Sequence, residues 1–342
     1  MSAPSATPAA ALGRRRSLPG VLRSPALHLI LRRLAAAIPV LWGVTLLTFL
    51  VVEALPGSAA QQILGAGATP QDVAQLDAEL GTDRPMVVRY FDWLGGLVTG
   101  DLGRSLTDER AVTAVIGSRF GVTFELVVFA LVFSLAFTVP VALLAARKPG
   151  GIVDRISVTV SMAGLSMANY VLALVLVYIF AVELAVLPAI GYVSPGESIV
   201  ENVRSLLLPA VSIGFPLFCF YTRLLRADIL DQMQGQDYIT TAKAKGAGPW
   251  RVLVRHAFRN SLFGLLTIVG LNLGTLIGAT VIVESIFALP GIGQQLLQAI
   301  SNRDIPVIEG IVLVFAVIVV VANLITDILY SVLDPRVRHG DN

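Results

Sequence analysis

Six long runs of apolar residues, separated by polar links, dominate the pattern of this chain. They cover residues 31–52, 120–146, 156–186, 206–225, 262–287 and 305–333. Each run reaches the ~20 residues that a helix needs to cross the hydrocarbon core of a bilayer. The third is long enough to tilt or to include an interfacial turn, and Pro209 and Pro216 predict a kink in the fourth. We therefore expect an all-α integral membrane fold with six transmembrane helices.

Composition supports a membrane protein and gives no sign of a catalytic, metal or nucleotide site in the chain. Apolar residues make up 55% of the sequence and charged residues only 14%, whereas a soluble domain is about a quarter charged. The single cysteine, Cys219, cannot form an internal disulfide, and the three histidines are too scattered for a metal site. No glycine-rich phosphate-binding motif is present. We expect a non-catalytic chain with no cofactor, metal or nucleotide site of its own.

The distribution of lysine and arginine predicts the orientation, because these residues collect in cytoplasmic loops. They are frequent before the first run, in the second-to-third and fourth-to-fifth links, and after the last run. An even number of spans with both termini in the cytoplasm puts every basic link on the cytoplasmic side. This is the arrangement expected for a multi-pass protein of a bacterial cytoplasmic membrane. Residues 1–26 are expected to form a disordered basic cytoplasmic tail, ahead of a first transmembrane helix at 27–52.

The link between the first two spans, residues 53–119, is long, acidic and expected to form an external domain. Thr69 followed by proline predicts the start of a helix over 70–80, since threonine caps helices and proline favours their first turn. Tyr90, Phe91 and Trp93 suggest an aromatic belt or a small packed subdomain. Such a domain is suited to meeting an external partner. Residues 120–342 are then expected to form a core of five transmembrane helices.

Residues 237–260, between the fourth and fifth spans, are basic and largely polar. The sequence favours a helix up to residue 245, a left-handed stop at Gly246, and a second helix opened by Pro249. Two short helices folded back at a membrane surface are typical of a docking element. A basic loop that only sets topology is the plainer alternative, but it does not explain the helix–glycine–helix order. The residues expected to dock are Asp237, Thr240, Thr241, Ala242, Lys243, Lys245, Gly246, Pro249, Trp250, Arg255 and His256.

Polar residues inside the apolar runs are candidates for a pathway or gate. Glu284 lies near the outer end of the fifth span, where a carboxylate is costly unless it faces protein or water. A pathway or gate residue and an interfacial group bonded to a helix end or a basic partner fit it equally well. The further candidates are the polar residues Asn169, Asn272, Thr275 and Thr280, which commonly form local helix–helix hydrogen bonds instead, and the aromatic residue Phe287. Gly270, Gly274 and Gly278, spaced four apart, favour close helix packing within the chain over a subunit interface.

Several longer motifs together resemble one family of membrane proteins. They are LRRLAAAIPVLWGVTLLTFLVVEALPG at 31–57, GDLGRS at 100–105, DYITTAKAKG at 237–246, RHAFRNSL at 255–262, VIVESIFALPGIG at 281–293 and LDPR at 333–336. With them the chain resembles the permease subunits of ABC importers of the dipeptide, oligopeptide and nickel class, over nearly its whole length after the tail. The family's EAA-xxx-G loop maps onto Thr240, Thr241, Ala242 and Gly246, where the first two positions depart from the Glu-Ala of the name.

The resemblance implies the type I importer permease fold and a set of partners. These are a second homologous permease subunit, two cytoplasmic ATPase subunits that bind ATP and magnesium, and an external substrate-binding protein. The EAA loop would form a coupling helix seated in a cleft of the ATPase, and the permease halves would rock between inward-open and outward-open states. Dipeptides or short oligopeptides are the expected cargo, with nickel chelates, glutathione or haem as alternatives.

Other classes of function fit the sequence less well. An ion-driven secondary transporter would need more intramembrane ionisable groups and inverted repeats. An intramembrane enzyme would need a nucleophile–base or metal constellation within the spans. An exporter is disfavoured because no nucleotide domain is fused to the chain. No nucleic-acid partner is expected, since the basic segment has few aromatic residues and lies close to the membrane on both sides.

Overall fold

A computed structural model describes residues 25–54, 59–65, 67–234 and 236–333. These residues contain no β-strand, only an isolated bridge between Arg104 and Ala111, so the all-α prediction is confirmed. The helices are α1 (Pro25–Glu53), α2 (Ala59–Leu64), α3 (Pro70–Leu80), α4 (Met86–Val98), α5 (Val112–Arg147), α6 (Ile152–Leu165), α7 (Asn169–Leu176), the π-helix η2 (Val177–Glu183), α8 (Ile199–Met233), α9 (Asp237–Ala244), α10 (Pro249–Val252), the π-helix η3 (Leu253–Phe258), α11 (Arg259–Leu271), α12 (Leu273–Ile286), α13 (Ile292–Asn302) and α14 (Ile305–Leu333). The predicted tail falls outside the described residues except at Pro25 and Ala26, which already belong to α1.

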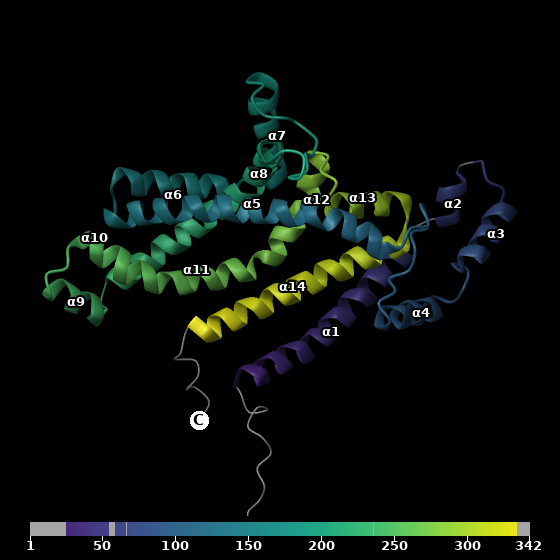
Figure 1. The fold of residues 1–342 in the computed structure, drawn as a ribbon, viewed down its shortest axis with the longest axis horizontal. Helices are drawn as coiled ribbons and strands as arrows, with labels where there is room; N and C mark the ends of the chain where they lie inside the picture. The colour runs from purple at the N-terminus through teal and green to yellow at the C-terminus, as the bar shows by residue number, and fades with distance from the viewer. Residues whose placement is uncertain (1–24, 55–58, 66, 235, 334–342) are drawn as a thin grey trace, which may run out of the picture.

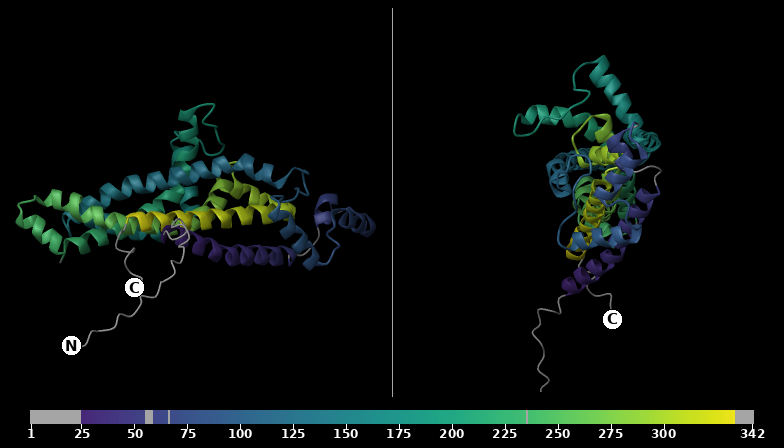
Figure 2. Two further views of the ribbon diagram at one scale, coloured as in Figure 1. Left: turned by 60° about the horizontal axis from the view of Figure 1, so that its bottom comes forward. Right: turned by 90° about the vertical axis from the view of Figure 1, so that its right-hand side faces the viewer.

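The molecule is an elongated bundle whose two ends carry different elements (Figure 1). Helices α1, α5, α6, α11 and α14 run along its length. Helices α9 and α10 lie at one end, called here the α9 end, and α2, α3 and α4 lie at the opposite end, called the α3 end. Helix α7 projects sideways from the middle of the bundle, and Figure 2 shows the same projection from two further sides.

Five of the described helical stretches are long and apolar enough to cross a membrane, and a bent pair makes a sixth. The five are Arg32–Glu53, Val112–Arg147, Ile199–Met233, Pro249–Leu271 and Ile305–Ile328. This agrees with the predicted six spans in number. Two of the predicted spans, however, are not single helices.

The predicted span at 156–186 is the bent pair. Helix α6 ends at Leu165, and α7 begins at Asn169 after a bend of 105°. The residues between them include neither proline nor glycine. Because both halves are apolar, hydropathy alone reads them as one run. The π-helix η2 then extends α7 towards Glu183.

The predicted span at 262–287 is divided at Asn272 into α11 and α12, so its interpretation as one helix is wrong. Asparagine and the nearby Gly270 and Gly274 are weak helix formers, which favours a break at this point. Helix α11 instead continues the helical stretch from Pro249, which has 23 residues, whereas α12 is a shorter apolar helix.

Two further spans are longer than hydropathy predicts. Helix α5 begins at Val112 rather than at residue 120, so part of the predicted external domain belongs to it. Helix α8 runs from Ile199 to Met233 rather than over 206–225, and it continues through both of its prolines. Its start is capped by the Ser198 hydroxyl, which accepts a hydrogen bond from the Glu201 backbone at 3.3 Å. Polar helix ends of this kind do not register as apolar runs.

The predicted helix at 70–80 is confirmed as α3, with the expected cap. The Thr69 hydroxyl accepts a hydrogen bond from the Asp72 backbone at 3.2 Å, and the Asp72 carboxylate accepts one from the Thr69 backbone at 3.0 Å. The Thr69 hydroxyl also donates to the Asp72 carboxylate, and these bonds lower the pKa of Asp72 below its ordinary value.

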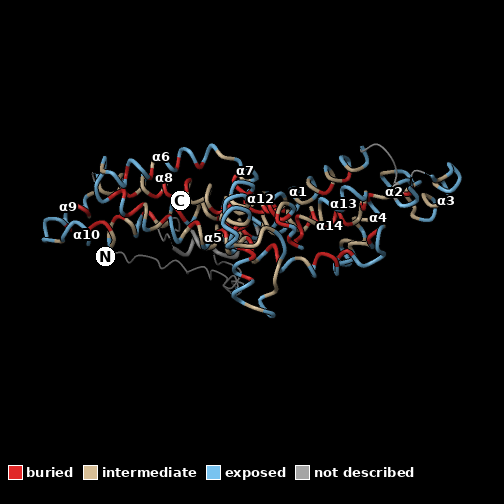
Figure 3. Tube along the Cα trace, turned by 90° about the horizontal axis from the view of Figure 1, so that it is seen from above, coloured by how far each residue is buried: buried red, intermediate tan, exposed pale blue. Residues whose placement is uncertain are grey.

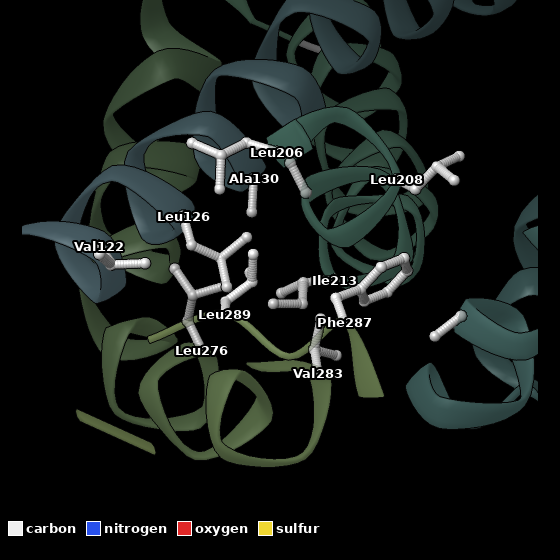
Figure 4. Close-up of a cluster of buried hydrophobic side chains, with 12 residues drawn as sticks. Val122, Leu126, Ala130, Leu206, Leu208, Ile213, Leu276, Val283, Phe287 and Leu289 are labelled. Carbon is white, nitrogen blue, oxygen red and sulfur yellow. The ribbon is translucent and has the colours of Figure 1, made fainter. Parts of the chain in front are cut away.

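Buried residues concentrate along the middle of the bundle, whereas α9 and the α3 end are largely exposed (Figure 3). One buried cluster joins α5, α8 and α12, where Leu126, Ile213 and Phe287 point toward one another (Figure 4). A second cluster joins α5 and α8 to α9, α10 and η3. The pair formed by α5 and α8 therefore links the centre of the bundle to the α9 end.

Candidate coupling segment and translocation cavity

The segment at the α9 end has the helix–glycine–helix form that the sequence predicts. Gly246 follows α9 with a φ of +79°, in the left-handed region, and Pro249 opens α10. The backbone N–H groups of Gly246 and Ala247 donate to the carbonyls of Lys243 and Ala242, at 3.0 and 3.1 Å. These bonds satisfy carbonyls that the end of α9 would otherwise leave free.

An apolar face fixes this segment to the rest of the bundle. Ile239 and Ala242 of α9 and Val252 of α10 are buried in one cluster with Tyr221 and Leu225 of α8. Burying a large aliphatic side chain contributes about 1.5–3 kcal/mol. The packing indicates that α9 and α10 move together with α8 rather than as a free loop.

The opposite face of the segment is open to solvent. Trp250 is exposed, and the Arg147 guanidinium lies over its ring at 5.7 Å from the centroid. Of the residues predicted to dock, Ala242 is buried and His256 is half-buried. The exposed ones are Asp237, Thr240, Thr241, Lys243, Lys245, Gly246, Pro249, Trp250 and Arg255. The segment is thus a packed tip with an exposed, largely basic surface.

An ion pair that the sequence did not reveal lies near this tip. Both oxygens of the Asp154 carboxylate, in the first turn of α6, accept hydrogen bonds from Arg226 of α8, and the contact to Nη2 is 2.8 Å long. The Gly150 backbone also donates to Asp154, at 2.8 Å. Asp154 is 4% exposed. The one signal in the sequence is a lone aspartate close to the start of an apolar run.

A cavity of about 220 Å³ lies where the two broken spans meet, and it brings three of the predicted pathway residues together. Asn169 begins α7, while Asn272 and Thr275 lie at the break between α11 and α12. The rest of the lining is mostly apolar: Leu165, Ile213, Pro216, Leu217, Phe220, Leu276 and Ala279. A few convergent polar groups in an apolar cavity are typical of a small-molecule site.

The other three predicted pathway residues lie in packed surroundings instead. Thr280 is buried and donates its hydroxyl to the Ile277 carbonyl of its own helix at 2.7 Å. Phe287 is 1% exposed and belongs to the central cluster. Glu284 is fully buried. None of these three lines the cavity at the helix breaks.

The Glu284 carboxylate joins three helices. One oxygen accepts from the Thr123 hydroxyl of α5 at 2.7 Å, and the other accepts from the Gln294 backbone in the first turn of α13 at 3.0 Å. Thr123 in turn accepts from the Ile292 backbone at 2.8 Å. A β-carbon at Gly291 would collide with the Glu284 carboxylate. Of the two interpretations that the sequence leaves open, this arrangement favours a group bonded to a helix end, because backbone N–H groups at a helix start favour an anion.

The predicted glycine stripe lies against α14 over part of its length. A β-carbon at Gly270 would collide with Thr326, and one at Gly274 would lie 3.4 Å from Val319. A β-carbon at Gly278 would meet open space. Of the three glycines, Gly270 is therefore the one that the close packing of α14 most requires.

A second buried carboxylate, missed from the sequence, holds the GDLGRS motif near the α3 end. Asp304 accepts from the Ser105 hydroxyl and from the Leu106 backbone, the latter at 3.1 Å. Ser105 and Asp304 are 5% and 3% exposed. Because these residues are far apart in the sequence, no local pattern predicts their contact.

Two family models match this chain. One, for the binding-protein-dependent transport system inner membrane component, matches residues 138–339, and the model for the N-terminal part of such membrane components matches residues 26–127. The chain belongs to this family. It is accordingly a multi-pass membrane component of a binding-protein-dependent transport system.

Relatives match over most of their length. The dipeptide transport system permease protein of Alkalihalophilus pseudofirmus is 37% identical over 329 residues, covering 90% of this chain and 98% of the relative. The protein of that name from Escherichia coli is 36% identical, covering 92% and 99%. A putative peptide transport system permease protein of Brucella abortus is 40% identical, covering 91% and 99%.

Proposed function

We propose that the chain forms half of the translocation pathway of an ATP-driven importer of dipeptides or short oligopeptides. The names of the relatives support the peptide cargo. The partners are a second homologous permease, two ATPase subunits in the cytoplasm and an external substrate-binding protein. ATP and magnesium bind to the ATPase subunits, and this chain contributes no catalytic group.

One observation carries the coupling part of the proposal: the tip formed by α9 and α10 is packed on one face and exposed on the other. A segment that receives force from a partner needs both properties. The exposed face offers basic groups to the ATPase, and the buried face passes displacement to α8 and α5. Arg226 and Asp154 extend this connection to α6.

The α9 end is proposed to face the cytoplasm and the α3 end the outside. The start of α1 and the end of α14 both lie towards the α9 end of the bundle (Figure 1). Arg32 and Arg33 lie near the start of α1, as expected for cytoplasmic residues. On this orientation, both termini are proposed to lie in the cytoplasm.

In the proposed cycle, ATP binding closes the two ATPases and draws the coupling segments together. The permease halves rock from inward-open to outward-open, and hydrolysis resets them. The cavity at the helix breaks is proposed to contact the passing peptide. The side chains of Asn169, Asn272 and Thr275 both donate and accept hydrogen bonds, as the amide groups of a peptide do.

The coupling role is tested by reversing charge on the exposed tip. In a Lys243→Glu, Arg255→Glu variant we expect weaker co-purification with the ATPase subunits, because the tip would repel the acidic surface it is proposed to meet. Wild-type association should weaken as salt screens these charges. Arg84→Glu, at the opposite end of the bundle, is the matched control. Unchanged co-purification of the double variant at low salt would refute docking by this surface.

A further inference from the structure

Helix α4 carries an apolar stripe on its surface. Val87, Phe91 and Val98 are 64%, 61% and 86% exposed. Their spacing of four and then seven residues places them on one side of a helix. Asp92, on another side of α4, forms an ion pair at 3.6 Å with Arg84, which lies just before the helix. Helix α4 is therefore amphipathic, with its apolar side outward.

Two other sides of α4 hold it against the end of α1. The Tyr90 hydroxyl lies 3.1 Å from the Thr45 hydroxyl, and Arg89 forms an ion pair with Glu53 at 3.1 Å. Thr45 and Glu53 lie about 12 Å apart along a helix axis, yet consecutive residues of α4 reach them. Both residues also contact Phe49, whose ring centroid lies 5.3 Å from that of Tyr90 and 5.7 Å from the Arg89 guanidinium, so α4 packs on the last third of α1.

The order of these contacts around α4 shows which side of the helix carries the stripe. Arg89 reaches Glu53, the last residue of the α1 span, whereas Tyr90 reaches Thr45 within that span. Each residue turns the helix by about 100°, so the next step from Tyr90 brings Phe91 to the side roughly opposite Arg89. The stripe therefore lies on the side of α4 away from Arg89 and Glu53.

The depth of α4 identifies what covers the stripe. The α1 span has 22 residues, close to the thickness of a hydrocarbon core. On the same part of α1, Leu47 and Val51 are 63% and 56% exposed and face the surroundings of the bundle. The contacts of α4 with Thr45 and Glu53 set the stripe at the level of this part of the span, close to the membrane boundary.

We propose that α4 is an interfacial helix whose stripe of Val87, Phe91 and Val98 inserts into the acyl chains of the outer membrane leaflet. Amphipathic helices bind in this way with the apolar face buried and the polar face in the headgroup region. The contact would anchor the link between α1 and α5 to the bilayer beside the pathway. The assignment to the outer leaflet rests on the orientation given under the proposed function.

The test places a fluorophore on single cysteines in a Cys219→Ser background. Phe91→Cys probes the stripe, Asp92→Cys is the matched neighbour on the polar side, and Val87→Cys repeats the stripe measurement if Phe91→Cys does not assemble. The assembled transporter is placed in vesicles whose phospholipids carry bromine on the acyl chains. We expect quenching several-fold stronger at residue 91 or 87 than at residue 92, with or without the binding protein.

Equal quenching at the stripe and at residue 92 would overturn the proposal. So would a stripe position shielded only when the binding protein is added, which would mark a protein-docking surface instead. The measurement reads lipid contact in the assembled complex and does not depend on transport. Loss of ATP-driven uptake would count against the proposed function while leaving this result readable.

Discussion

Glu284 shows how the surroundings of a residue decide between two interpretations of it. From the sequence, a gate residue and a group bonded to a helix end are equally suitable. In the structure its carboxylate is fully buried and accepts hydrogen bonds from Thr123 and from the start of α13. A side chain so placed links α5, α12 and α13, and we expect its main contribution to be the position of α13.

Replacing Glu284 with alanine should destabilise the protein. The variant leaves the Thr123 hydroxyl and the Gln294 backbone N–H without their acceptor, at about 1–3 kcal/mol for each buried group. The midpoint of thermal unfolding of the purified complex should fall for Glu284→Ala. Because Glu284→Gln keeps one acceptor oxygen, its midpoint should lie closer to that of the wild type. If Glu284→Gln unfolds normally but abolishes uptake, the charge itself serves the pathway and the linking role is insufficient.

Gly246 is constrained by its backbone and not by its neighbours. Its φ is +79°, and a β-carbon there would meet nothing within 4 Å. Gly246→Val should therefore cost about 1–2 kcal/mol in the left-handed conformation and displace α10 relative to α9. We expect ATP hydrolysis without matching uptake, or failed assembly with the ATPases. Gly246→Asn should be milder, since asparagine tolerates this region. Normal uptake and yield for the valine variant would contradict the role of this turn.

At the level of elements, the Asp154–Arg226 pair joins the first turn of α6 to α8 near the coupling tip. Asp154→Ala leaves Arg226 without its partner, which we expect to destabilise the protein by about 2–4 kcal/mol given the partial exposure of the arginine. Replacing both residues, as Asp154→Leu with Arg226→Met, should recover most of the stability. Coupling of hydrolysis to uptake should recover with it. If both variants unfold like the wild type, the pair does not hold α6 to α8.

The elements also show what the sequence can and cannot predict. The α3 cap and the helix–glycine–helix tip depend on neighbouring residues, so Thr69, Gly246 and Pro249 were sufficient to predict them. The bend after Leu165 and the division at Asn272 lie within long apolar runs, and hydropathy carries no angular information. Contacts such as Ser105 with Asp304 depend on tertiary packing between distant segments, and no single-sequence pattern encodes them.

Across the whole molecule, the cavity at the two helix breaks lies between the coupling tip and the α3 end. Broken spans provide backbone and side-chain polar groups in the middle of an apolar bundle, which is where transporters commonly hold their substrates. The packed pair of α5 and α8 passes beside this cavity and reaches the tip. Movement of the tip is therefore expected to change the shape of the cavity.

Substitutions at the cavity should separate substrate contact from packing. Asn169→Leu and Asn272→Leu remove hydrogen-bonding groups from the lining, and we expect peptide uptake to fall several-fold while ATPase association persists. Thr280→Val is the matched control, because its hydroxyl bonds only to the Ile277 carbonyl of its own helix. Uptake assays with vesicles of known transporter content measure the difference. If Asn169→Leu and Asn272→Leu take up peptide as fast as the Thr280→Val control and the wild type, the peptide does not contact this cavity.

The most direct test of the central claim measures ATP hydrolysis by the complete transporter. The chain is assembled in nanodiscs with its second permease and the two ATPases, and hydrolysis is followed with and without the binding protein and peptide. The account predicts stimulation by the peptide-loaded binding protein, and loss of coupled transport when Gly246 is replaced by valine. Failure of any ATPase to assemble with the chain, together with solute movement driven by an ion gradient alone, would contradict it.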